Sequence, residues 1–118
     1  MKEEVVLFEP NVLIELAEDT SGDTMKRYVE GYLAELEGKV TRLGSALSEN
    51  NQDQVVHIAH DLKGSSAAVG ASALSRLAKQ MENSARVGQL AAAQIAYKRL
   101  PKLVEPSCDS IRDWLADQ

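Results

Sequence analysis

Hydrophobic residues recur at intervals of three and four along most of the chain, which is the spacing of one face of an α-helix. The longest such stretch comprises Met25, Val29, Tyr32, Leu33, Leu36, Val40, Leu43 and Leu47. It predicts a long helix that ends at residues 49–51, where polar residues interrupt the pattern. The strand-like sequence at residues 5–8 is short and isolated, so no sheet is expected. We therefore predict an all-α fold.

One further helix is predicted on each side of this long one. Pro10 suits the first position of a short helix, and residues 19–23 end that helix and cap the next. Asn51 is expected to cap the helix that follows, because Gln54 lies at the capping-box spacing. Gly70 is expected to end it. The hydrophobic residues of the two helices are Val12, Leu13, Leu16 and Ala17, and then Val55, Ile58, Ala59, Leu62 and Val69.

The C-terminal half is predicted to form two more helices. Ser72 is expected to cap the first, Gly88 ends it, and the second begins near Gln89. The buried stripe of the first comprises Leu74, Leu77, Ala78, Met81 and Ala85. The hydrophobic residues of the second are Leu90, Ala93, Ile95, Ala96, Leu100, Leu103 and Val104.

Two prolines complicate the last helix. Pro101 and Pro106 are each expected to kink or break it, because proline lacks a backbone donor and clashes with the preceding turn. Residues 107–116 are expected to continue as a final helical piece. The predicted architecture is an up-down four-helix bundle with a short additional N-terminal helix.

Composition and charge limit the class of protein. The 118 residues suit a single domain over residues 1–118, with 44% hydrophobic and 26% charged residues as in globular chains. The net charge of −5 makes nucleic acid a poor partner, and no hydrophobic stretch is long enough to cross a membrane. Cys108 is the only cysteine and is expected to be a passive thiol, while residues 1–4 lack the features of a signal peptide. We expect a cytoplasmic protein.

His60 is predicted to face solvent. On an ideal helix with about 100° between successive residues, the hydrophobic side chains of the third predicted helix centre near Ile58 and Leu62. His60 and Gly64 point roughly 160° away from that centre. An exposed imidazole is largely unprotonated at neutral pH and is then a competent nucleophile. The position of His60 therefore suits chemistry rather than packing.

The predicted surface around His60 is bare for an exposed helix face. Gly64 and Ala67 lie one and two turns further along this face, and Ala68 lies beside them. A glycine inside a helix costs about 0.5–1 kcal/mol relative to alanine. The small residues leave room for the backbone or a loop of another protein to approach the imidazole.

Residues 60–71 read His-Asp-Leu-Lys-Gly-Ser-Ser-Ala-Ala-Val-Gly-Ala and closely resemble the signature of histidine-containing phosphotransfer (HPt) domains. In that family the pattern is histidine, any residue, leucine, lysine, glycine and serine, with a further glycine downstream. The matching positions are His60, Leu62, Lys63, Gly64, Ser65 and Gly70. The helical pattern is also similar to that of the family over nearly the whole chain.

The resemblance implies a carrier of phosphoryl groups rather than an ATP-dependent kinase. His60 would accept a phosphoryl group from the phospho-aspartate of one receiver domain and pass it to the aspartate of another. The receiver would bring Mg²⁺ and an acidic pocket, and a hybrid sensor histidine kinase is a further implied partner. No cofactor is expected on this chain, which lacks a phosphate-binding glycine loop and a kinase signature. We expect it to be a monomer.

Side chains near His60 are candidates for contact with the phosphoryl group. Lys63 lies within reach on the helix surface and would offset part of the added negative charge. Ser65 and Ser66 could add hydroxyl contacts, although both lean towards the packed side of the helix. Gly64 would give the receiver access to the imidazole.

The following helix carries one departure from the family pattern. Some members have a glutamine there that hydrogen-bonds the histidine ring, and this place falls at Glu82. A carboxylate could orient the ring and raise its basicity, or it could point to solvent. Lys79 and Arg86 lie on one stripe and could guide an acidic receiver, or form an ordinary solvated face. The candidate partner-binding residues are His57, Lys63, Gly64, Ala67, Ala68, Lys79 and Arg86.

Three other interpretations of the sequence are a metal site, an interaction module and a piece of a larger kinase. Asp53, His57 and Asp61 follow an i, i+4 ladder, but two histidines on one helix are too few ligands for a stable zinc site, so no metal site is predicted. His57 is then an ordinary surface residue. The chain could instead be a non-catalytic helical interaction module that docks through Gly64 and its neighbours. It could also be the phosphotransfer piece of a larger hybrid sensor kinase.

Overall fold

The computed structural model of this chain describes residues 6–118, and all regular elements within them are helices. They are α1 (Asn11–Asp19), α2 (Gly22–Ser48), α3 (Gln52–Ala68), α4 (Ser72–Arg86), α5 (Leu90–Tyr97) and α6 (Leu100–Ala116). The predicted all-α class is confirmed. Residues 1–4, whose sequence lacks the features of a signal peptide, and Val5 of the strand-like sequence lie outside the described residues. No helix of the described part is long and apolar enough to cross a membrane.

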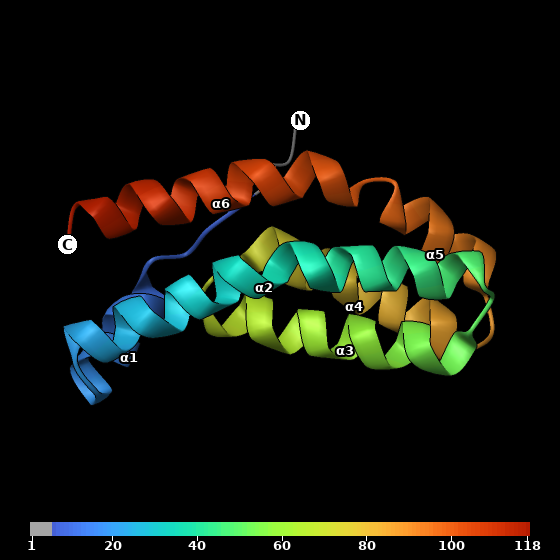
Figure 1. The fold of residues 1–118 in the computed structure, drawn as a ribbon, viewed down its shortest axis with the longest axis horizontal. Helices are drawn as coiled ribbons and strands as arrows, with labels where there is room; N and C mark the ends of the chain where they lie inside the picture. Colours follow the sequence, from blue (N-terminus) through green and yellow to red (C-terminus); the bar gives the residue numbers. More distant parts are fainter. Residues whose placement is uncertain (1–5) are drawn as a thin grey trace.

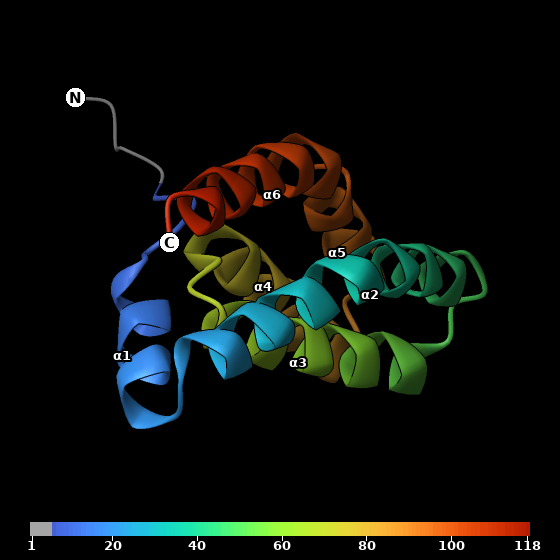
Figure 2. The same cartoon turned by 60° about the vertical axis from the view of Figure 1, so that its left-hand side comes forward.

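The long helices run lengthwise along the molecule (Figure 1). α3 and α4 form the most closely packed pair, and α2 packs against α3. α5 follows α4 at one end, and α6 then runs back along the molecule above α2 and α4, while α1 lies across the opposite end (Figures 1 and 2). The site described below lies on the α3–α4 pair, so these two helices set its geometry.

Side-chain caps begin two of the helices at the places that the sequence predicts. The Ser21 hydroxyl accepts a hydrogen bond from the Thr24 backbone N–H over 3.0 Å at the start of α2. The side-chain amide oxygen Oδ1 of Asn51 accepts one from the Gln54 N–H over 3.2 Å at the start of α3. Each cap satisfies a backbone donor that the first turn of a helix leaves unpaired. The predicted cap at Asn51 is confirmed.

The predicted cap at Ser72 is wrong. Ala71 occupies the capping position of α4, and Ser72 is the first helical residue. The Ser72 hydroxyl donates a hydrogen bond to the Glu9 carboxylate over 2.7 Å instead of accepting one from its own helix. The reason is tertiary, because the chain before α1 packs against the α3–α4 turn and brings Glu9 within reach.

The two prolines have different effects. The last predicted helix is divided at Lys98 and Arg99, so that Pro101 falls in the first turn of α6, where a missing backbone donor costs nothing. Pro106 lies inside α6, which continues to Ala116, so the break expected there does not occur. The predicted helical piece over residues 107–116 is the second half of α6.

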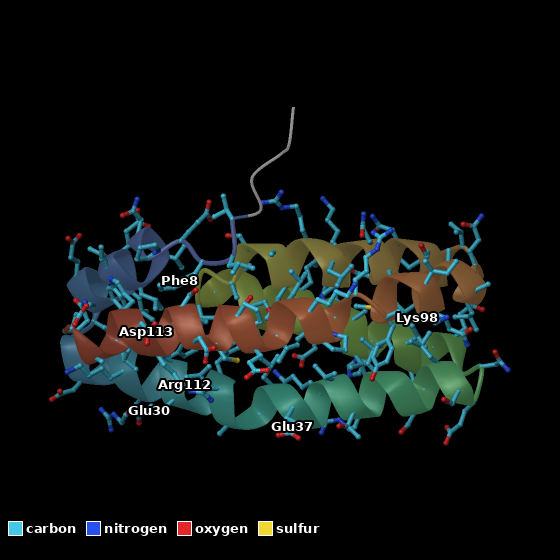
Figure 3. The ribbon with its side chains drawn as sticks, turned by 90° about the horizontal axis from the view of Figure 1, so that it is seen from above. Phe8, Glu30, Glu37, Lys98, Arg112 and Asp113 are labelled. Atoms are coloured by element: carbon cyan, nitrogen blue, oxygen red, sulfur yellow. The ribbon has the colours of Figure 1, made fainter. Side chains whose placement is uncertain are left out.

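The hydrophobic stripes of the helices meet in one core. Ile95 is an exception and is 60% exposed, because α5 is short and buries Ala93 and Ala96 instead. At the edge of the core, the rings of Phe8 and Trp114 meet edge to face with centroids 5.9 Å apart, and Phe8 is labelled in Figure 3. The largest fully buried side chains are Leu13, Leu36, Leu43, Leu62, Leu74, Met81, Leu100 and Ile111.

Gly70 makes the tight turn between α3 and α4, and we expect Gly70→Ala to destabilise the fold. Gly70 has a φ of +78°, and its carbonyl accepts a hydrogen bond from the Glu9 N–H over 2.8 Å. An added Cβ would overlap the Glu9 carbonyl oxygen. We expect a loss of about 1–3 kcal/mol in the free energy of unfolding, measured by urea denaturation.

Gly88 is the matched control. Its φ is +77°, but an added Cβ there would meet nothing within 4 Å. Gly88→Ala should therefore lose only the cost of the backbone conformation and should remain more stable than Gly70→Ala. Equal losses in the two variants would contradict a role for the contact with Glu9.

Candidate functional site

His60 lies on the exposed face of α3, as the helical wheel predicts. Its side chain is 62% exposed, whereas Ile58, Ala59 and Leu62 on the same helix are buried. Gly64 and Ala67, one and two turns further along, are exposed, and Ala68 is half-buried. The imidazole therefore stands at a surface that is open to a partner.

Glu82 on α4 holds the His60 ring. The Glu82 carboxylate is 3% exposed, and its Oε2 lies 2.8 Å from Nδ1 of His60. Its Oε1 accepts a hydrogen bond from Lys63 Nζ over 2.6 Å. Arg86, one turn along α4, donates to Oε2 from Nη2 over 2.7 Å and from Nε over 3.2 Å. A single carboxylate thus joins a histidine and two cations.

The Glu82 carboxylate is ionised at neutral pH. Burial by itself would raise the pKa of Glu82, but hydrogen bonds from Lys63, Arg86 and His60 outweigh burial and lower the pKa to about 2. An ionised carboxylate can only accept hydrogen bonds. The proton of the neutral imidazole is therefore assigned to Nδ1, where it is donated to Glu82, and Nε2 is left with its lone pair.

The low pKa of Glu82 predicts a pH-dependent contribution to stability. The ordinary pKa of a glutamate is 4.5 and that of Glu82 is about 2, so the contribution is fully present above pH 4.5 and is lost as the pH falls towards 2. Urea denaturation of the wild type and Glu82→Gln at several pH values measures it. The stability difference between the two proteins should shrink as the pH falls from 4.5 towards 2. A difference that stays constant over this range would contradict the assignment.

The two serines of the motif do not join the site. The Ser65 hydroxyl donates to the Leu62 carbonyl over 3.3 Å, within its own helix. Ser66 is fully buried, and its hydroxyl shares a hydrogen bond of 2.8 Å with the hydroxyl of Tyr32 on α2. Both lean towards the packed side, as expected, but neither supplies a hydroxyl contact to His60.

The remaining candidates are distributed around the site. His57 is exposed one turn before His60, and Lys79 is exposed on α4. Asp61, the last member of the histidine and aspartate ladder, pairs with Lys39 of α2 over 3.1 Å rather than with His57. Arg86, a candidate from the sequence for guiding a partner, also pairs with Glu82, and its side chain remains 55% exposed.

Sequence reasoning missed the function of Arg86 as a partner of Glu82. The signal was present in the sequence, because a glutamate four residues before an arginine is a favourable pair on a helix. The contact of Glu82 with Lys63 could not be predicted from spacing along one helix, because Lys63 lies on α3. It depends on how α4 packs against α3.

Comparisons with known proteins agree with the helical fold and with the family that the sequence resembles. The family model described as the Hpt domain matches residues 27–114. The crystal structure of histidine-containing phosphotransfer protein B (HptB) from Pseudomonas aeruginosa PAO1 is similar to this chain, with a TM-score of 0.87 and 23% sequence identity. The similarity covers 98% of this chain and 99% of that one and shows a shared fold. No curated protein gives a significant match. The family model matches well over half of the residues of this chain. The chain therefore belongs to the Hpt domain family, the phosphotransfer intermediates of phosphorelays.

Proposed function

We propose that the chain accepts a phosphoryl group on Nε2 of His60 from the phospho-aspartate of one receiver domain and passes it to the aspartate of another. The observation that carries this proposal is an exposed imidazole whose Nδ1 faces an ionised, buried carboxylate. Membership of the Hpt family supports the class of reaction. The geometry supports the choice of His60 and of Nε2.

The first step needs an in-line attack by Nε2 on the phosphorus atom. The bond from nitrogen to phosphorus forms, the bond from the aspartyl oxygen breaks, and the aspartate of the receiver leaves as a carboxylate. The phosphorylated ring keeps the proton on Nδ1 and carries a positive charge, which the Glu82 carboxylate at 2.8 Å stabilises.

The second step reverses these bonds at another receiver. An aspartate oxygen attacks phosphorus, the bond to Nε2 breaks, and the imidazole leaves as a neutral ring that still holds its Nδ1 proton. A ring without that proton would have to leave as an anion, which is a much poorer leaving group. Glu82 therefore supports both directions of transfer by keeping Nδ1 protonated.

The charges around the site suit a phosphoryl group. Lys63 and Arg86 together carry two positive charges against the single negative charge of Glu82. The excess positive charge favours the addition of a dianionic group next to His60. Lys63 pairs with the carboxylate that contacts the ring and lies on the same helix as His60, so we expect this cation to offset part of the phosphoryl charge. Mg²⁺ belongs to the receiver in this proposal, where it would offset the phosphoryl charge.

Access and architecture complete the proposal. The exposed small residues Gly64 and Ala67 would let a receiver approach the imidazole closely. The fold corresponds to an up-down four-helix bundle if α5 and α6 are taken together as the fourth helix and α1 as the additional N-terminal one. We propose that this single domain acts in the cytoplasm as a monomer, without ATP-dependent kinase activity of its own.

The experiment that tests the proposal is phosphoryl transfer from phosphorylated receiver domains to the purified chain. Several receivers are used, because pairing is selective. We expect label that is lost in acid and kept in base, as the chemistry of a phosphorus–nitrogen bond requires. Label that survives acid, or no label from any receiver while the chain is folded by circular dichroism, would contradict the proposal.

A further inference from the structure

A furrow lies beside the His60 site, between α3 and the first half of α4. It has a volume of about 500 Å³. The residues that line it are Lys63, Gly64, Ala67, Ser72, Ser75, Arg76, Lys79 and Glu9. Lys63 and Gly64 border both the furrow and the surroundings of His60, so a protein that reaches His60 comes within about one helical turn of the furrow.

The residues that line the furrow carry a net positive charge, although the chain as a whole has a net charge of −5. Arg76 and Lys79 are both exposed, and within residues 6–118 neither forms an ion pair with a carboxylate. Glu9 is the acidic residue among those that line the furrow, and its carboxylate is held by the Ser72 hydroxyl over 2.7 Å. Two cations are therefore available to a negatively charged partner.

Small residues also line the furrow. A Cβ added to Gly64 would meet nothing within 4 Å, so packing within the chain does not require a glycine there. A mid-helix glycine nevertheless costs about 0.5–1 kcal/mol relative to alanine. Ala67 and Ser75 continue the low surface. The small residues leave room for the backbone of a partner segment beside Arg76 and Lys79.

We propose that this furrow receives an acidic surface segment of the receiver domain, whose carboxylates pair with Arg76 and Lys79. This inference rests on the proposed function, because it names the part of the receiver that docks next to His60. Opposite charges on two facing surfaces raise the rate at which two proteins associate, and like charges disfavour the wrong partner. The furrow therefore helps to determine which receivers exchange phosphoryl groups with this chain.

The test compares transfer from a receiver with direct phosphorylation by the small donor phosphoramidate. The variant is Arg76→Glu with Lys79→Glu, and the receiver is the one that transfers fastest to the wild type. The rate from the receiver is divided by the rate from phosphoramidate, so that changes at His60 itself cancel. We expect this ratio to fall on the order of tenfold at low salt, and the difference from the wild type to shrink as salt screens the charges.

The matched control is Lys98→Glu with Lys102→Glu, which changes the net charge equally. Lys98 (Figure 3) precedes α6 and Lys102 lies on it, outside the furrow. This control should keep the wild-type ratio. A ratio that is unchanged in the Arg76 and Lys79 variant, or that falls equally in the control, would overturn the inference. If the double variant fails to fold, Arg76→Gln and Lys79→Gln are measured singly, with a smaller fall expected in each.

The same experiment separates this inference from the function on which it rests. Phosphoramidate labelling of the wild type together with transfer from a receiver supports the proposed function, whatever the furrow variants do. Absence of label from both donors would contradict the proposed function and the furrow inference together.

Discussion

His60→Gln abolishes phosphoryl transfer from receivers and from phosphoramidate alike, which is the largest effect that we expect. Glutamine has a polar side chain but no ring nitrogen that can attack phosphorus. Its amide can still donate a hydrogen bond to the Glu82 carboxylate, which also keeps its bonds to Lys63 and Arg86. The variant should therefore remain folded. The measurement is acid-labile label, with circular dichroism and thermal unfolding of the same samples.

The alternative to His60 is well defined, because His57 is the other histidine of the chain. His57 lies on the same helix and is exposed, but within residues 6–118 its side chain has no contact with a carboxylate like that of His60 with Glu82. Acid-labile label that persists in His60→Gln would move the phosphorylated residue to His57. Mass spectrometry of the labelled peptide would separate the two positions.

Glu82→Ala slows phosphoryl transfer on the order of 10- to 100-fold, by analogy with the carboxylates that orient histidine in other protein sites. The substitution removes the acceptor at Nδ1, so both tautomers of the neutral ring become accessible and fewer rings present Nε2 as the nucleophile. It also leaves Lys63 and Arg86 without their shared carboxylate. The measurement is the single-turnover rate of transfer to and from a receiver, with unfolding curves as the check on stability.

Glu82→Gln separates charge from shape at this position. The amide oxygen can still accept from Nδ1, but it carries no full charge to hold a proton on the phosphorylated ring. We expect a smaller loss in the rate of transfer than in Glu82→Ala. As the pH is raised, the rate of onward transfer should also begin to decline at a lower pH than in the wild type. A pH profile identical to that of the wild type would show that the charge of Glu82 has no part in transfer. A merely structural role for Glu82 would change stability and leave the profile unmoved.

The helices and the exposure of His60 could be predicted because they depend on local spacing. A helix places residues three and four apart on one face, so the buried stripe of α3 predicts where its opposite face lies. The cap at Asn51 depends on contacts within a single turn, and it too was predicted correctly. Ser72 shows the limit of such reasoning, since its hydroxyl turns to Glu9, which is 63 residues away in the chain.

The continuation of α6 through Pro106 and the orientation of the Glu82 side chain could not be predicted from the sequence, for two different reasons. The helical rule for proline is local, yet α6 continues through Pro106, because the packing of a long helix can outweigh the lost backbone hydrogen bond and the clash with the preceding turn. Glu82 depends on geometry between helices, and a small rotation of α4 would have turned its carboxylate to solvent. The sequence alone was compatible with a Glu82 carboxylate that faces the ring and with one that faces solvent.

The sequence by itself determined that this chain is helical, that His60 faces solvent, and that its motif is that of a phosphotransfer domain. These properties follow from periodicity and from a short run of residues that lie on one helix. Only the tertiary structure decided how the ring is held, by bringing Glu82 and Arg86 of α4 to His60 and Lys63 of α3. It also placed Arg76 and Lys79 beside the bare surface at Gly64. The physical reason is that both features lie between two helices, where the distances between side chains are set by the packing of the whole core.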